Sequence, residues 1–286
     1  MAPGSLRSIL GLTQKYALKT LGRPLVLAVD QEGGAVRRLY APFFRLPAAR
    51  DLGALDAQTI WGIGRRVGQE LSETGFNLNL APVLDLDLGK GGYVGSRSFG
   101  PDPATVAEKA GAFMAGLLAG GVLSCGKHFP GLGGTPLDPH EMVPEILGPK
   151  AKFAGSFHVF RSLAKKGLPA VMTTHALYPA LDPSHIATFS SRIARILRRE
   201  VGFDGLLLSD DLEMGAILGR QDLGRAAVRA ALAGHDLLLV CRRAESIRKA
   251  RNALCEAIES DRLAQGRLLE SGERLGRFLG LLPTNG

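Results

Sequence analysis

Leu206-Leu207-Leu208-Ser209 is a short, largely apolar run, and two carboxylates, Asp210 and Asp211, follow it directly. Apolar runs of this kind, without alternation, are typical of strands buried on both faces of a parallel sheet. Five further runs share the pattern, at residues 25–29, 77–80, 123–127, 170–174 and 237–240. Helical patterns lie between them, including residues 60–74, 103–119, 191–201 and 224–233. The repeated order of strand and helix predicts a parallel α/β fold.

Polar side chains follow several of these strands at the point where each strand ends. Asp30 follows the first, Lys127 and His128 close the third, His175 follows the fourth and Asp210 the fifth. In a parallel barrel these ends share one rim, where active sites are built, whereas in an open doubly wound sheet they line a crevice. No G-x-G-x-x-G or P-loop follows any strand, which disfavours nucleotide binding. We therefore favour a TIM-type (β/α)8 barrel.

Length and composition indicate one globular domain over residues 1–286, with 45% hydrophobic and 22% charged residues. The net charge of +8 is compatible with anionic partners. The late arginines, however, lie at helical spacing without interleaved aromatic residues, which argues against nucleic acid. No run is long enough to cross a membrane and no secretory signal is present, so a cytoplasmic location is expected. Helices are also expected at residues 5–21 and, as one long helix, at 243–281.

The three cysteines are too few and too scattered for a disulfide framework. Cys125 and Cys241 lie in apolar runs, so we expect both thiols to be buried and inert. The histidines and carboxylates show no metal-ligand spacing such as H-E-x-x-H. The sequence therefore predicts no metal and no cofactor.

Two short segments carry the residue types needed for acid–base and nucleophilic chemistry. Asp138-Pro139-His140 places an imidazole two residues from a carboxylate on a loop rich in Gly and Pro, although a surface Asp-x-His is also common. Asp210 emerges at a strand end, where a carboxylate can act as a nucleophile. The alternative for the pair Asp210–Asp211 is capping of the next helix, and we expect Asp211 either to cap that helix or to support the site from behind Asp210.

Five motifs occur in order along the chain: Val29-Asp30-Gln31-Glu32-Gly33-Gly34, Leu80-Ala81-Pro82-Val83-Leu84-Asp85, Arg97-Ser98-Phe99-Gly100, Lys127-His128-Phe129-Pro130-Gly131 and Ser209-Asp210-Asp211-Leu212-Glu213-Met214. This series resembles the family 3 glycoside hydrolases, specifically the bacterial β-N-acetylhexosaminidases that recycle cell-wall sugars. The resemblance covers most of the chain, from about residue 24 to residue 241. One such motif would be weak, but five in register are specific.

The resemblance implies a (β/α)8-type barrel and a retaining mechanism through a covalent glycosyl-enzyme. It matches Asp210 to the nucleophile, His140 to an unusual histidine acid/base and Asp138 to the carboxylate partner of that histidine. Residues matched to the grip on the terminal sugar are Asp30, Arg38, Arg97, Lys127 and His128. Retaining glycosidases usually pair two carboxylates about 5 Å apart. An imidazole, with an ordinary pKa of about 6.5, can take one of these roles with little tuning.

Alternatives remain for two of the matched residues and for His175. Asp30 and Arg38 could instead form a structural ion pair at the barrel rim. His175 could line the pocket or be a hydrogen-bonded core histidine. The chain also departs from the family pattern, with Leu132 in place of a histidine, Pro139 in place of a serine and Ser96 in place of an acidic residue.

A larger departure concerns the start of the barrel. Family members carry two strands before the motif at Asp30, but here that motif ends by residue 34 and six strands are visible. Either the start of the gene product is missing or the barrel is incomplete, atypical and open at its N-terminal side. Open sheet edges favour pairing with another chain, so a homodimer is expected.

The sequence thus predicts an exo-glycosidase that removes terminal β-linked N-acetylglucosamine from a small saccharide, with cell-wall fragments as the source. A β-glucosidase or a glycoside phosphorylase on the same fold is the nearest alternative. A catalytically silent sugar-binding protein is the alternative from another class.

Overall fold

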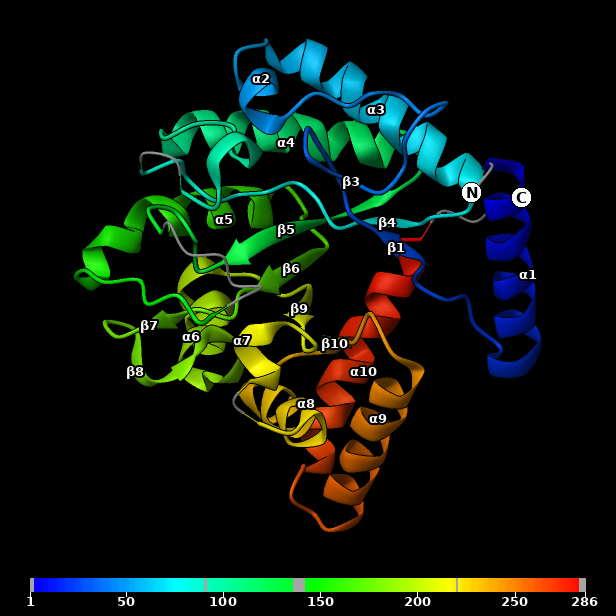
Figure 1. The fold of residues 1–286 in the computed structure, drawn as a ribbon, viewed down its shortest axis with the longest axis vertical. Coiled ribbons are helices and arrows are strands. Elements are labelled where there is room, and N and C mark those ends of the chain that lie inside the picture. The colour runs from blue at the N-terminus through cyan, green and yellow to red at the C-terminus, as the bar shows by residue number, and fades with distance from the viewer. Residues whose placement is uncertain (1–2, 90–91, 136–141, 220, 283–286) are drawn as a thin grey trace.

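The computed structural model describes residues 3–89, 92–135, 142–219 and 221–282. Its centre is a parallel sheet of six strands in the order β1-β4-β5-β6-β9-β10 (Figure 1). These strands are β1 (Ala28–Val29), β4 (Leu78–Asn79), β5 (Leu123–Phe129), β6 (Ala170–Thr173), β9 (Leu206–Asp211) and β10 (Leu237–Leu239). All six strand predictions are therefore confirmed.

The central sheet curls into an incomplete barrel, as the count of visible strands predicted. Within the described residues, β1 and β10 are the edges of the sheet and do not pair with each other. Alternation along each strand separates two apolar clusters: Leu206 and Leu208 belong to one and Leu207 to the other. A strand that is buried on both faces in this way needs the uninterrupted apolar run seen in the sequence.

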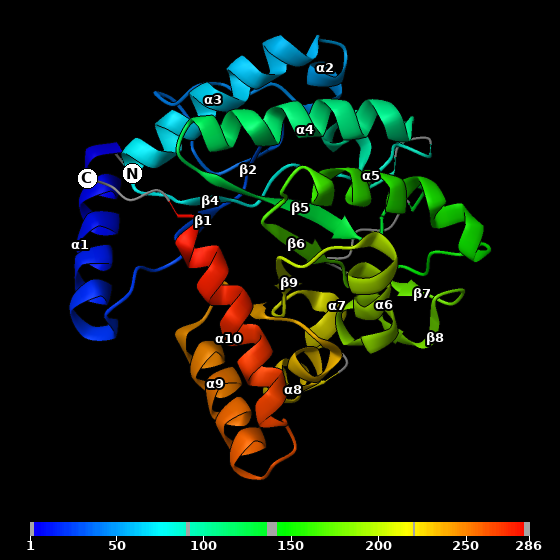
Figure 2. The same cartoon turned by 180° about the vertical axis from the view of Figure 1, so that it is seen from behind.

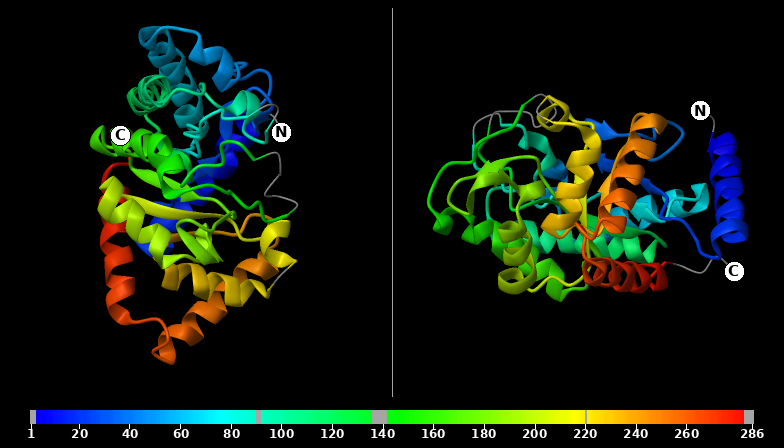
Figure 3. Two further views of the ribbon diagram at one scale, coloured as in Figure 1. Left: turned by 90° about the vertical axis from the view of Figure 1, so that its left-hand side faces the viewer. Right: turned by 90° about the horizontal axis from the view of Figure 1, so that it is seen from below.

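Helices cover the outside of the sheet, as Figure 3 shows from two further sides. The helices are α1 (Pro3–Leu21), α2 (Ala49–Gly53), α3 (Ala57–Thr74), α4 (Pro103–Ala119), α5 (Ala154–Lys165), α6 (Ser191–Arg195) with its π-helical continuation Ile196–Val201, α7 (Gly215–Leu218), α8 (Leu223–Ala233), α9 (Ala244–Glu259) and α10 (Gln265–Gly280). Short 3-10 helices span Gly95–Arg97, Lys150–Phe153 and Ala187–Phe189. Among the described residues, no helix is long and apolar enough to cross a membrane.

Helices α3 and α4 lie side by side above the sheet (Figure 2). Asp56 and Asp102 cap their N-termini by accepting hydrogen bonds from Thr59 and Thr105. The two helices approach closely at glycines, since a Cβ at Gly64 would lie 2.6 Å from a backbone oxygen of α4. Buried residues of α3 and α4 belong to the same apolar cluster as Leu207.

The C-terminal helix covers the apolar cluster to which Leu206 and Leu208 belong. Phe278 of α10 and Leu282 just beyond it pack with Leu78, Leu123 and Leu206 on one face of the sheet. The prediction of one helix over residues 243–281 is wrong, because α9 ends at Glu259 and α10 begins at Gln265. The chain reverses between them through Asp261, which has a positive φ of 56°, and this turn lets α10 fold back against the sheet.

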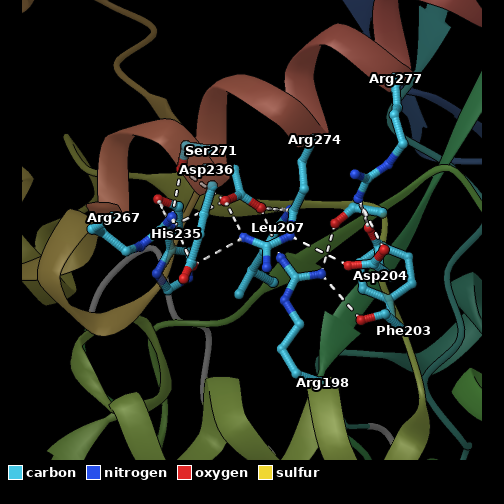
Figure 4. A network of polar contacts seen from close by, with 12 residues as sticks. Arg198, Phe203, Asp204, Leu207, His235, Asp236, Arg267, Ser271, Arg274 and Arg277 are labelled. Atoms are coloured by element: carbon cyan, nitrogen blue, oxygen red, sulfur yellow. Dashed lines mark hydrogen bonds and ion pairs between the residues drawn. The ribbon is translucent and has the colours of Figure 1, made fainter. Parts of the chain in front are cut away.

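A buried carboxylate anchors α10 and the π-helical segment to the sheet (Figure 4). Asp236, directly before β10, has no exposed side-chain surface and pairs with Arg198 at 2.7 Å, Arg267 at 3.0 Å and Arg274 at 3.2 Å. It also accepts the backbone N–H of Leu207 at 3.0 Å. Several of the late arginines thus serve the fold.

Two antiparallel hairpins lie outside the central sheet and were not predicted. They are β2 (Gln31–Gly33) with β3 (Val36–Arg37), and β7 (Leu177–Tyr178) with β8 (Asp182–Ile186). Both follow the carboxyl end of a central strand, so they add to the rim at which the polar residues gather.

Candidate active site

A pocket of about 330 Å³ lies at the carboxyl ends of the central strands. Six sequence-predicted residues line it: Asp30, Arg38, Arg97, Lys127, His128 and Asp210. They come from the ends of β1, β5 and β9, from the residue directly after the β2–β3 hairpin and from a short 3-10 helix. The remaining lining residues are Glu32, Val36, Leu80, Tyr93, Met172, Asp211, Leu239, Cys241 and Arg242. The strand ends therefore meet at one rim, as expected for a barrel.

Ion pairs fix the basic residues on one side of the pocket. The Lys127 Nζ atom lies 2.8 Å from Asp30 Oδ1 and 2.5 Å from Glu32 Oε1. Arg97 binds both oxygens of Glu32, with Nε–Oε2 at 2.8 Å and a second nitrogen at 2.9 Å from Oε1. Within the described residues, Asp30 pairs with Lys127, and its side chain stays 31% exposed toward the pocket.

Glu32 is a site residue that the sequence reasoning missed. Burial alone would raise the pKa of its carboxyl, but Lys127 and Arg97 outweigh that effect and hold the pKa at about 2. Glu32 therefore stays ionised and keeps the two cations in place. The signal was present in the sequence, because Glu32 lies two residues after Asp30 in the same motif.

His128 is oriented by a second missed residue, Asp85. The Nδ1 atom of His128 lies 2.7 Å from Asp85 Oδ2, and both side chains are almost fully buried. Asp85 Oδ1 accepts the backbone N–H of Leu132 at 2.7 Å. The opposite ring atom, Nε2, lies 3.4 Å from an Arg97 nitrogen. Asp85 thereby ties His128 to the loop that follows β5.

Asp210 is the last residue but one of β9, and its side chain is half-buried at the pocket. Burial by itself would raise the pKa of its carboxyl, yet the nearby His175, His128 and Lys127 lower the pKa below the usual value of 3.8. The backbone N–H of Asp211 also donates to Asp210 Oδ1 at 2.8 Å. The arrangement keeps an ionised carboxylate facing the pocket, which is what a carboxylate nucleophile requires.

Asp211 supports the backbone and does not cap a helix. Its Oδ1 accepts hydrogen bonds from the N–H groups of Glu213 at 3.0 Å and Cys241 at 3.2 Å. Of the two roles expected for Asp211, the supporting role is observed and capping is not, because α7 begins at Gly215 with Met214 at its N-cap. Asp211 joins the segment after β9 to the segment after β10.

His175 is fully buried directly behind the pocket. Its Nδ1 lies 2.6 Å from Thr188 Oγ1, and its Nε2 lies 3.0 Å from the Asp211 carbonyl oxygen. Of the two alternatives, the hydrogen-bonded core histidine is the one observed. The residue still matters electrostatically, because its charge lowers the pKa of Asp210.

The expectation of buried, inert thiols is correct for Cys125. For Cys241 the expected burial is wrong, although partial burial and the nearby carboxylates raise the pKa of its thiol to about 12. Cys125 is fully buried in β5, and burial raises the pKa of its thiol to about 12. Cys241 is exposed and lines the pocket. The reason is that β10 ends at Leu239, so Cys241 lies on the rim beyond the buried run.

Asp138 and His140, the predicted acid/base pair, lie outside the described residues. The described chain places Thr135 on one side of them and Met142 on the other. Within the described parts of the chain, no group of three His, Cys, Asp or Glu side chains is arranged to hold a metal ion.

Comparison with known protein families gives a match over nearly the whole chain. Residues 6–278 match the N-terminal domain of glycosyl hydrolase family 3. The chain belongs to this family. The strand order, the rim position of the polar residues and the series of five motifs all agree with that membership.

The curated relatives of this family 3 chain include proteins named β-hexosaminidase. That of Neisseria gonorrhoeae (strain FA 1090) is 39% identical over 245 residues, covering 82% of this chain and 68% of the relative. That of Pseudomonas aeruginosa (strain LESB58) is 42% identical over 234 residues, covering 79% of this chain and 68% of the relative. The chain thus matches about two thirds of the length of these relatives.

Solved structures of the family superimpose on almost all of the chain. A β-N-acetylglucosaminidase from Paenibacillus sp. str. FPU-7 has a TM-score of 0.94 at 34% identity, covering 99% of this chain and 56% of that protein. A β-N-acetylhexosaminidase from Beutenbergia cavernae has a TM-score of 0.89 at 32% identity, covering 96% of this chain and 84% of that protein. The chain therefore has the fold of the N-terminal domain of family 3 glycoside hydrolases.

Proposed function

We propose that residues 1–286 form a single catalytic domain that acts as a retaining exo-glycosidase. It would remove terminal β-linked N-acetylglucosamine from cell-wall-derived saccharides. The observation that carries the proposal is the ionised Asp210 at a pocket of about 330 Å³, opposite a group of close ion pairs that Asp30 and Glu32 form with Lys127 and Arg97. The names of the relatives and of the solved structures support this choice of sugar.

In the proposed first step, an oxygen of Asp210 attacks the anomeric carbon and forms a glycosyl ester as the bond to the leaving group breaks. His140 would donate a proton to the departing oxygen, and Asp138 would hold the histidine ring. In the second step, water gives a proton back to His140 and attacks the anomeric carbon, which releases the sugar and regenerates Asp210. The roles of His140 and Asp138 rest on the family resemblance.

We assign binding of the terminal sugar to the side of the pocket where Asp30, Lys127 and Arg97 form ion pairs. Asp30 can accept a hydrogen bond from a sugar hydroxyl, since its side chain remains partly exposed. Arg97 and Lys127 are held by Glu32, so they can donate without reorganising. Arg38 supplies further donors at the same pocket, where His128 is an additional polar residue of the lining.

The test is release of nitrophenol from an aryl β-N-acetylglucosaminide by the native chain, Asp210→Asn and Asp211→Asn. We expect Asp210→Asn to lose at least about 10³-fold in kcat, because the attacking carboxylate is removed. Asp211→Asn should lose much less. The first-formed sugar, followed by NMR, should have the β configuration of the substrate. Equal losses in the two variants, or an α product, would contradict the proposal.

Other outcomes separate the alternatives. A rate that requires phosphate indicates a phosphorylase, and a preference for aryl β-glucosides indicates a β-glucosidase. Saccharide binding without turnover in folded native protein indicates a silent sugar-binding protein.

Two accompanying expectations concern location and assembly. We infer action in the cytoplasm on saccharide fragments, which fractionation of the native host would test. The edges of β1 and β10, which have no partner strand in the described parts of the chain, favour a homodimer. Light scattering that gives a monomer, together with cooperative unfolding by calorimetry, would count against the dimer.

A further inference from the structure

The charged groups at the pocket pair with one another unequally. Glu32 and Asp30 engage Lys127 and Arg97 in close contacts. Arg242 has a much longer contact, with its Nε atom 3.8 Å from Asp211 Oδ2, and its side chain is 61% exposed. The Lys127 side chain, by contrast, is only 3% exposed. The pocket therefore has a buried, paired cationic side and an exposed guanidinium at its mouth.

The backbone that carries this guanidinium is held firmly. The N–H groups of Arg242 and Arg243 donate to Glu213 Oε2 at 2.5 Å and 3.3 Å. The preceding N–H, of Cys241, donates to Asp211 Oδ1 at 3.2 Å. Three successive amides thus fix the segment after β10 against the segment after β9, while the Arg242 side chain stays available.

We propose that Arg242 forms a subsite for a carboxylate on the leaving-group side of the scissile bond. This inference rests on the proposed exo-glycosidase function. In such an enzyme the terminal sugar occupies the buried part of the pocket, so the leaving group extends toward the exposed mouth. A guanidinium presents N–H donors in a planar fork that matches a carboxylate.

Within the described residues, the carboxylate contact of the Arg242 guanidinium is weak. Among the described contacts, the carboxylate paired with the Arg242 guanidinium is that of Asp211, whose other oxygen already accepts two backbone hydrogen bonds. A contact of 3.8 Å at a largely exposed side chain contributes little. A substrate carboxylate that covers the mouth would exclude water and form a shorter pair.

A matched pair of disaccharides tests the subsite. One is N-acetylglucosamine β-linked to N-acetylmuramic acid, and the other is diacetylchitobiose, which lacks the lactyl carboxylate. The measured quantity is the ratio of kcat/KM for the acidic to the neutral substrate. We expect Arg242→Ala to lower this ratio about tenfold. This loss is larger than that of a fully exposed ion pair and smaller than that of a fully desolvated ion pair. Arg242→Lys should recover part of the loss.

The control is Arg243→Ala, which removes the same charge one residue away, at an exposed side chain that does not line the pocket. It should leave the ratio unchanged. Higher salt should lower the ratio for the native chain more than for Arg242→Ala. The subsite is rejected if Arg242→Ala leaves the ratio unchanged, or if Arg243→Ala lowers it equally.

Failure of the proposed function would have a different appearance. If the native chain cleaves neither disaccharide nor the aryl glycoside, the glycosidase proposal fails and the subsite is tested by calorimetric binding. The native chain should then bind the acidic disaccharide more tightly than the neutral one, and Arg242→Ala should remove that preference. Equal affinities in the native chain would reject the subsite.

Discussion

Asp85 and His128 form a buried pair in which the carboxylate lies 2.7 Å from Nδ1 of the imidazole. With Nδ1 donating to Asp85, the Nε2 atom is left on the side of Arg97, 3.4 Å away. A carboxylate in this position fixes the ring orientation and the tautomer. Because the other oxygen of Asp85 holds the Leu132 amide, one side chain sets both the imidazole and the start of the following loop.

The first prediction is that Asp85→Asn lowers kcat/KM about 10- to 100-fold, the usual effect of removing a carboxylate that orients a functional histidine. An amide retains the size of the side chain but can present an N–H to the ring and so select the wrong tautomer. Kinetics with the aryl glycoside measure the loss. The 15N chemical shifts of the His128 ring should also show a changed tautomer, which a merely structural role would not require.

Asp87→Asn is the control for this prediction. Asp87 lies two residues further on and forms a more exposed ion pair with Arg50 at 2.9 Å. We expect nearly native kinetics from it, because exposed pairs contribute about 0–1 kcal/mol. If both variants had the same activity and the His128 ring kept its native tautomer, the positioning role of Asp85 would be wrong.

The second prediction concerns Glu32, which is 4% exposed between Lys127 and Arg97. Glu32→Gln should lower the free energy of unfolding by about 3–5 kcal/mol, because two buried cations lose their shared carboxylate. Urea denaturation measures the change. Glu108→Gln, at an exposed pair with Lys109, is the control and should change stability by less than about 0.5 kcal/mol.

The pKa of Glu32 gives this prediction a pH dependence. Its pKa is about 2 in the folded chain against a usual 4.5, so between these values the unfolded chain binds more protons. The stabilisation is complete above pH 4.5 and is lost as the pH falls toward 2. The difference in stability between the native chain and Glu32→Gln should shrink over that window. A constant difference would contradict the ionised, paired state of Glu32.

The central sheet could be predicted from sequence because its signal is local. Each strand is a short apolar run, and burial on both faces demands that run wherever it occurs. The break between α9 and α10 could not be predicted in the same way, since residues 243–281 keep a helical pattern throughout. What ends α9 is the turn at Asp261 and the packing of Phe278 on distant strands, which are tertiary effects.

The site was predictable where residues face the pocket from strand ends. Asp30, Lys127 and Asp210 each follow or close an apolar run. Because the carboxyl ends of parallel barrel strands lie at one rim, these residues line the same pocket. Glu32 and Asp85 were missed because they act on other side chains, at sequence separations of 65 residues for Arg97 and 43 residues for His128. Nothing in the local pattern distinguishes such a carboxylate from one that binds substrate.

The third prediction concerns His235, a buried histidine remote from the proposed chemistry. Burial is the largest effect on it and lowers the pKa of the imidazole to about 4. Its Nδ1 lies 3.1 Å from the Ala230 carbonyl oxygen and its Nε2 lies 2.8 Å from Thr173 Oγ1, so the neutral ring is hydrogen-bonded on both sides. The folded chain therefore resists protonation of this residue.

Because the folded pKa of His235 lies below the usual 6.5, the stabilisation is present above pH 6.5 and is lost as the pH falls toward 4. One proton taken up on unfolding corresponds to about 1.4 kcal/mol per pH unit. His235→Gln should lower stability at neutral pH and reduce the slope of unfolding free energy against pH by about that amount. An imidazole signal of His235 that titrates near pH 6.5 in the folded chain would overturn this prediction.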